Sequence, residues 1–172
     1  MNYNTSLIIR ILTPFVLSYN LIQKITLFAT INLTYIILGF INLNTFLIDD
    51  FLIYNETYVK LIPSCAAASA YFLLLLLVVL TKDIKFLTRI KIFLLGSLVI
   101  LLFNIIRIII LILILNNYSI SLFNSIHLFF WAIASSILVA FIWIYLTKRY
   151  KIRSIPIYSD LKYLLKKTNL YK

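Results

Sequence analysis

Long apolar runs are the feature that most constrains how this chain can fold. The longest, residues 92–115, exceeds the roughly 20 residues that an α-helix needs to cross a bilayer. Only 12% of the 172 residues are charged, whereas a soluble domain carries roughly a quarter, and the mean hydropathy is +1.06. Because lipid cannot satisfy free backbone groups, each span has to be a helix. The sequence therefore predicts an all-α, multi-pass integral membrane bundle.

We expect about five transmembrane helices. Four long segments stand out as spans: residues 25–40, 65–80, 92–115 and 122–146. A fifth segment, residues 6–19, is short and contains an arginine and a proline, so it either spans or lies at the interface. The connection 41–64 has β-prone pieces on both sides of Asn55 and Glu56. This pattern predicts a small hairpin on the membrane before the third span.

Basic residues gather in two places and predict the orientation of the helices. The loop 81–91 and the tail 147–172 hold twelve of the sixteen Lys and Arg residues, whereas the connection 41–64 is net acidic and the turn 116–121 has no charge. Lys and Arg beside membrane spans stay cytoplasmic. We therefore expect a plasma-membrane protein with the loop and tail inside and the other two connections outside. The N-terminus is then outside with five spans and inside with four.

The distribution of apolar and basic residues predicts a transmembrane domain and a separate basic tail. Residues 1–146 are predicted to form one transmembrane domain, and residues 147–172 a basic cytoplasmic tail. From Ser159 onward the tail places leucines on one face with lysines around them, which is typical of an amphipathic helix held by anionic headgroups. The alternative is a solvated tail that serves only topology.

Two ionisable residues and the only cysteine lie in or beside apolar segments. Arg107 and His127 lie inside the fourth and fifth spans, and Cys65 opens the third, two residues after Pro63. A charge at membrane depth costs at least ~2.5 kcal/mol, so such residues usually face an interior or a wet cavity and serve function. Helical rise places Arg107 roughly 12 Å and His127 roughly 9 Å from the external turn. Cys65 opens its span from the same side, so we expect all three in the outer half of the membrane.

Cysteine, histidine and a cation together form a minimal set for acyl transfer. The thiolate is the nucleophilic form of Cys65, and a nearby cation favours it. His127 can take and return a proton, and Arg107 can hold the thiolate or the oxyanion of a tetrahedral intermediate. Taken singly, each residue has an ordinary explanation: packing for the cysteine, an interhelical hydrogen bond for the histidine and snorkelling for the arginine.

Polar residues at helical spacing accompany this set. Asn104 shares a helix face with Arg107, because three residues separate them. A second polar stripe, on the fifth span, consists of Asn124, His127, Trp131 and Ser135. With one Cys, one His and no intramembrane acid, the residues do not indicate a metal site.

The order of these residues resembles the exosortase/archaeosortase family of membrane transpeptidases. The family pattern is a Cys followed by small residues at the start of a span, an Asn-x-x-Arg helix, and a His in the next helix. The matching residues here are Cys65, Asn104, Arg107 and His127. The family commonly has Cys-Ser/Thr-Gly, with a Ser five positions after the Cys. This chain instead has Cys-Ala-Ala-Ala, with Ser69 four positions after the Cys.

The resemblance covers roughly residues 41–146 and implies a sorting enzyme. Its substrates would be membrane-anchored proteins whose C-terminus has a short motif, a transmembrane helix and a basic cluster. The cysteine would attack the peptide bond near the motif, form a thioester and transfer the protein to an amine or lipid acceptor. No metal, organic cofactor or nucleic-acid partner is expected. The expected catalytic residues are Cys65, Arg107 and His127, and the expected supporting residues are Asn104, Ser69 and Asn124.

Two non-enzymatic classes use the same residues differently. A small transporter or ion-conducting subunit would use Arg107 and His127 as a relay. Such a protein usually needs a polar path through both leaflets, and the inner halves of spans three to five are almost purely apolar. A structural subunit of a membrane complex would use the two residues only as intramembrane polar contacts.

Overall fold

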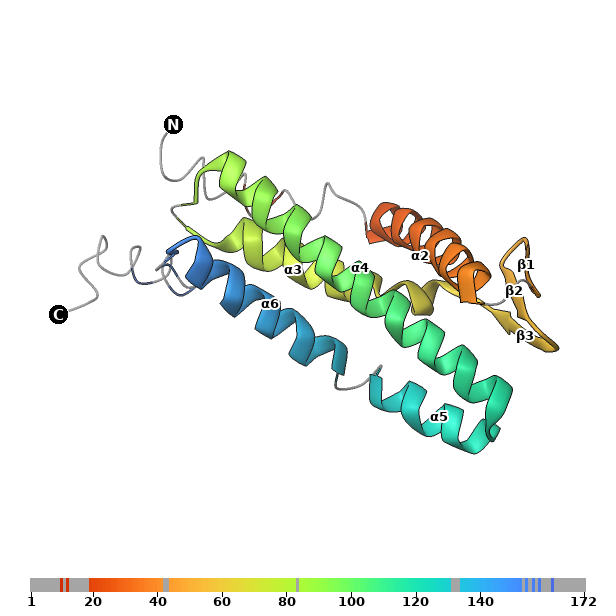
Figure 1. Ribbon diagram of the computed structural model, residues 1–172. Helices are drawn as coiled ribbons and strands as arrows, with labels where there is room; N and C mark the ends of the chain where they lie inside the picture. The colour runs from red at the N-terminus through yellow and green to blue at the C-terminus, as the bar shows by residue number, and fades with distance from the viewer. Residues whose placement is uncertain are drawn as a thin grey trace.

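The computed structural model describes residues 10, 12, 19–41, 44–82, 84–130, 134–152, 154, 156, 158 and 162. Its helices are α2 (Tyr19–Ile41), α3 (Ala68–Leu80), α4 (Phe86–Asn117), α5 (Ile120–Phe129) and α6 (Ser135–Arg149). A short 3₁₀ helix, η1 (Pro63–Ala66), precedes α3, and the strands are β1 (Thr45–Ile48), β2 (Phe51–Tyr54) and β3 (Thr57–Lys60). Figure 1 shows an elongated helical bundle with the small sheet at one end.

α4 is the central element of this bundle. It packs against α2, α3, α5 and α6 (Figure 1). Gly96 allows close contacts with α3 and α6, because a Cβ there would lie 2.6 Å from Leu74 Cδ2 and 3.3 Å from both Ile142 Cγ2 and Leu146 Cδ1. The absence of a side chain at Gly96 therefore lets α3 and α6 approach the α4 backbone.

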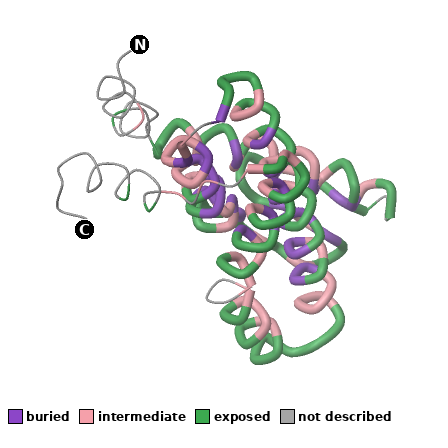
Figure 2. The backbone as a smooth tube through the Cα atoms, turned by 90° about the vertical axis from the view of Figure 1, so that its left-hand side faces the viewer, coloured by how far each residue is buried: buried purple, intermediate pink, exposed green. Residues whose placement is uncertain are grey.

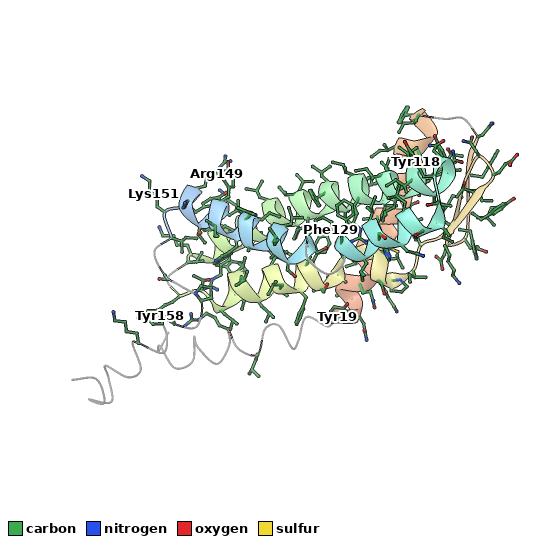
Figure 3. The ribbon with its side chains drawn as sticks, turned by 90° about the horizontal axis from the view of Figure 1, so that it is seen from below. Tyr19, Tyr118, Phe129, Arg149, Lys151 and Tyr158 are labelled. Carbon is green, nitrogen blue, oxygen red and sulfur yellow. The ribbon has the colours of Figure 1, made fainter. Side chains whose placement is uncertain are left out.

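The two ends of the bundle differ in chemistry. At one end, which we call the sheet end, β3 lies beside the end of α4, and the Thr57 hydroxyl donates to Asn116 Oδ1 at 3.1 Å. At the other, which we call the basic end, α4 begins and α6 finishes. Figure 3 shows Arg149 and Lys151 there, far from Tyr118 at the sheet end.

Buried apolar side chains form two clusters along α4, and Figure 2 shows the buried positions gathered inside the bundle. The first joins α3, α4 and α6 and includes Leu74 and Ile100. The second joins α2, the sheet and the last part of α4 and includes Leu52, Ile108 and Ile112. Along α4 the two clusters meet between Ile100 and Ile108, which is the segment that carries the predicted site residues.

Two of the described helices, α2 and α4, are long and apolar enough to cross a membrane, and α3 and α5 are apolar but shorter. α4 is apolar on its outward side as well as its inward side: Leu94, Leu98, Leu102 and Ile106 are all exposed. A helix that is hydrophobic all round is typical of a large core or a membrane span.

The connection before α3 folds as a three-stranded antiparallel sheet in the order β1-β2-β3. The predicted β-structure on both sides of Asn55 is confirmed, and a second hairpin precedes it. Both loops contain two residues, and the first residue of each, Asp49 and Asn55, has a positive φ of 52° and 53°. Asp and Asn tolerate this conformation better than most residues, which explains why the chain turns there.

The predicted single span over residues 122–146 is wrong in one respect, because the structure divides it into α5 and α6. Residues 131–133, including Trp131 of the predicted polar stripe, lie outside the described residues. The Ser135 hydroxyl donates to the Phe130 carbonyl, five residues earlier, at 2.9 Å. The Ser135 side chain thus satisfies the backbone carbonyl of the residue that follows α5. Serine can do this because its short side chain lets the hydroxyl reach nearby backbone groups.

Two connections are shorter than predicted. α4 begins at Phe86, inside the predicted loop 81–91, and the predicted turn 116–121 reduces to Tyr118 and Ser119. Ser119 explains the second difference, because its hydroxyl accepts a hydrogen bond from the Leu122 N–H at 3.3 Å and caps α5. The first apolar segment 6–19 and the tail helix from Ser159 lie largely outside the described residues.

Candidate functional site

Cys65 lies in η1, the tight turn that joins the sheet to α3. Pro63 begins this turn, and the Cys65 N–H donates to the Ile62 carbonyl at 2.8 Å. Ala67, between η1 and α3, has φ 52° and ψ 30°. This left-handed conformation costs a residue with a Cβ roughly 1–2 kcal/mol. The chain therefore turns sharply just after Cys65 and leaves its side chain half-buried.

Asn104 ties this turn to α4 and α2. It is 3% exposed, and its Nδ2 donates to the Cys65 carbonyl at 2.9 Å and to the Thr30 hydroxyl at 3.4 Å. Its Oδ1 is buried without a partner. One amide therefore holds the backbone of the cysteine against two helices, which places the thiol relative to α4.

Arg107 is the buried cation of the site. It is only 4% exposed, and its Nε and Nη2 have no hydrogen-bond partner. The guanidinium is close enough to Cys65 and to His127 to interact electrostatically with both. Two buried N–H groups without acceptors leave donor capacity for another group at this position.

A small cavity of about 10 Å³ adjoins Asn104 and Arg107. Ala67 and Ala70 of the cysteine turn and α3 line one side, and Ser135 at the start of α6 lines another. Such a volume is about the minimum that accommodates a single water molecule. Two of the three side-chain atoms left unpaired at the site belong to Arg107, so this narrow and mostly apolar space adjoins unpaired donors.

His127 lies on α5, which packs back against α4 after the two-residue turn. The imidazole is half-buried and stacks on the Phe123 ring, one turn earlier, with ring centroids 5.7 Å apart and an interplanar angle of 12°. This stacking limits the orientations of the imidazole. His127 is thus held within electrostatic range of Arg107.

The structure brings together four of the six predicted residues. A hydrogen bond links Asn104 to the Cys65 carbonyl, and Arg107 interacts electrostatically with both Cys65 and His127. Asn104 and Arg107 line the cavity, Cys65 and His127 do not, and Ser69 and Asn124 are exposed. Ser69 lies between Ala68 and Ala70, which are both buried, so it occupies the outward side of the first turn of α3.

Thr30 is a site residue that the sequence analysis missed. It is fully buried on α2 and accepts the second hydrogen bond of Asn104. Thr26 and Thr34 are buried on the same face, one turn before and one turn after it. This row of threonines, four residues apart within an apolar span, is the sequence signal that could have identified the face of α2 that meets the site.

Within the described residues, no group of three or more His, Cys, Asp or Glu side chains could hold a metal ion. Comparison with protein-family models, with curated proteins and with solved structures found no match. The chemistry of the site is therefore inferred from the residues themselves.

Proposed function

We propose that this protein is a membrane cysteine transpeptidase or peptidase that resembles the exosortase/archaeosortase family. The observation that carries the proposal is the buried Arg107, which has unpaired N–H groups and lies within electrostatic range of a half-buried cysteine and a half-buried histidine. An unpaired buried donor destabilises a fold. Such a donor fits a site in which negative charge develops during a reaction.

The reaction follows from these three groups. His127 takes the thiol proton of Cys65, and the resulting thiolate, stabilised by the positive charge of Arg107, attacks the carbonyl carbon of a peptide bond. The new carbon–sulfur bond leaves an oxyanion, which accepts hydrogen bonds from Arg107. When the oxyanion collapses, the carbon–nitrogen bond breaks, the leaving amine takes a proton from His127, and a thioester remains.

The second half of the reaction restores the enzyme. The acceptor is an amine or a lipid hydroxyl, and water gives hydrolysis instead. The acceptor or the water attacks the thioester carbon, while His127 takes a proton from the attacking group. The carbon–sulfur bond then breaks and returns the thiolate. Asn104 does not touch the reacting atoms in this scheme; it positions the cysteine through the Cys65 carbonyl.

In this proposal the protein is a multi-pass component of the plasma membrane. The acidic loops of the sheet, with Asp49, Asp50 and Glu56, face outside, and the basic end faces the cytoplasm. The site then lies in the outer half of the membrane. Its substrates are membrane-anchored proteins with a C-terminal motif, an apolar helix and a basic cluster.

The conformation of Ala67 supports the resemblance where the residue type does not. The family pattern has a glycine two positions after the cysteine, and Ala67 occupies that position here. Ala67 is also the residue that adopts φ 52°, a conformation that glycine reaches without steric cost. Ala67 therefore adopts a conformation that a glycine at this position would reach without that cost.

The test uses a co-expressed substrate that ends in a short motif, an apolar helix and an Arg/Lys cluster. Processing is measured as the loss of a C-terminal epitope tag from this substrate. We expect Cys65→Ala, Arg107→Ala and His127→Ala each to abolish processing while the protein still inserts. The matched controls Ser69→Ala and Asn124→Ala, which alter exposed residues of α3 and α5, should retain it. Full processing by Cys65→Ala would refute the proposal.

A further inference from the structure

A second hollow lies at the basic end of the bundle, on the side away from the cysteine turn. It has a volume of about 510 Å³ and lies between the start of α4 and the chain that follows α6. Its lining includes Lys85, Thr88, Tyr150, Lys151 and Ser154, with Ile84 as an apolar wall. Segments more than 60 residues apart in the sequence thus contribute one ammonium group each.

The lining is rich in donors that suit an anion. The hydroxyls of Thr88, Tyr150 and Ser154 accompany the two lysines. Thr88 belongs to the first turn of α4, where Lys85 at the cap position makes no side-chain capping bond and no acidic residue occurs. Backbone N–H groups of a first turn lack intrahelical partners and favour negative charge.

The surrounding charge has the same sign. Lys148 and Arg149 occupy the last turn of α6, immediately before the hollow. Of the five acidic residues, three lie in the loops of the sheet at the other end of the bundle. The other two, Asp83 and Asp160, lie outside the described residues. Among the described residues, the charged side chains that line the hollow or occupy the last turn of α6 are all basic, which favours an anionic ligand.

A separate apolar groove lies along the seam between α4 and α6. It has a volume of about 390 Å³, and its lining includes Leu95, Leu98, Phe141, Tyr145 and Arg149. Leu95 follows Thr88 by seven residues, or two turns on the same face of α4. Arg149 marks the end of the groove that is nearer the hollow, while the rest of the lining is almost entirely hydrocarbon.

We propose that the hollow binds the phosphate of an anionic membrane phospholipid, whose acyl chain lies in the groove between α4 and α6. The charge of the hollow matches the headgroup, and the groove matches the chain. This site is separate from the cysteine site, and the proposal does not depend on the transpeptidase activity.

The test is native mass spectrometry of the full-length protein in detergent with phosphatidylglycerol or phosphatidylcholine. The wild type should retain one phosphatidylglycerol in preference to phosphatidylcholine. The double variant Lys85→Gln/Lys151→Gln should lose that preference by about tenfold or more, because it removes two charge-assisted hydrogen bonds. The control Lys24→Gln/Lys91→Gln removes two charges that neither line the hollow nor belong to the last turn of α6, and it should bind like the wild type.

A second arm separates the phosphate from general charge. Inorganic phosphate should displace phosphatidylglycerol more effectively than chloride at the same ionic strength. Equal displacement by both salts, equal losses in the two double variants, or equal retention of the two lipids would overturn the proposal. Size-exclusion profiles matching the wild type would establish that the variants are folded.

Discussion

α4 carries two arginines, Arg89 in its first turn and Arg107 in its second half, and the two have opposite surroundings. In the first turn, all three guanidinium nitrogens of Arg89 donate hydrogen bonds to backbone carbonyls. Its Nε, Nη1 and Nη2 donate at 2.6–3.1 Å to the carbonyls of Ile84, Val78, Val79 and Thr81. These carbonyls belong to the end of α3 and the loop after it. Arg107, more deeply buried, has two nitrogens without any partner.

This difference distinguishes a structural cation from a candidate catalytic one. Both residues are arginines on the same helix, so neither residue type nor helix propensity accounts for it. The carbonyls at the end of α3 need donors, and Arg89 supplies them. Around Arg107 the helices offer apolar side chains and a small cavity instead. A buried N–H without an acceptor costs about 1–3 kcal/mol, so Arg107 lowers the stability of the fold.

The largest effect is expected at Arg89. Arg89→Met removes the donors from four carbonyls at the end of α3, and we expect the free energy of unfolding to fall by about 4 kcal/mol. Thermal unfolding in detergent, followed by circular dichroism, measures the loss. Arg89→Lys keeps the charge but cannot reach all four carbonyls, so it should recover only part of the stability. An unchanged melting temperature in Arg89→Met would remove the distinction between the two arginines.

A change of opposite sign is expected at Arg107. Arg107→Met replaces a buried, partly unpaired cation by an apolar side chain of similar length, which should raise the free energy of unfolding by roughly 2–3 kcal/mol. The same variant should process no substrate. Together, the unfolding and processing measurements show whether Arg107 lowers the stability of the fold while supporting activity. If Arg107→Met destabilised the protein as much as Arg89→Met, Arg107 would be structural as well.

Gly96 tests the packing of the basic half of α4. Gly96→Ala places a Cβ 2.6 Å from Leu74 Cδ2, so we expect a loss of about 2 kcal/mol from overpacking against α3 and α6. The control is Gly39→Ala in α2, where nothing lies within 4 Å of the new Cβ. There the better helix propensity of alanine should raise stability by about 1 kcal/mol. Equal melting temperatures for the two variants would show that the helices separate easily around Gly96.

The smallest effect is expected beside the cysteine. Ala67→Gly relieves the left-handed conformation at φ 52°, although glycine loses more backbone entropy on folding. The net gain should be below about 1 kcal/mol, with processing retained. Ala70→Gly, in the right-handed α3 helix three residues later, should lower stability by about 1 kcal/mol. Melting curves recorded side by side decide the sign, and a loss in both variants would contradict the assigned backbone conformation.

Much of the fold could be predicted from the sequence because the relevant signals are local. Apolar runs marked the positions of α2, α3 and α4, and Asp49 and Asn55 lie in loops because their side chains tolerate positive φ. Asn104 and Arg107 share a helix face because of helical periodicity alone. The break between α5 and α6 was not predictable in this way. The whole of 122–146 is apolar enough to be continuous, and the Ser135 bond to Phe130 appears only in three dimensions.

The sequence by itself determined the chemical inventory of the site: one cysteine, one histidine and one arginine in apolar segments, in an order that resembles a transpeptidase. Only the tertiary structure decided which residues meet. It brought Thr30 to Asn104, placed Ser69 and Asn124 at exposed positions, and gave Arg89 its acceptors while leaving two nitrogens of Arg107 without them. The physical reason is that hydrogen-bond satisfaction depends on atoms supplied by distant segments, whereas helix formation and charge distribution depend on neighbours along the chain.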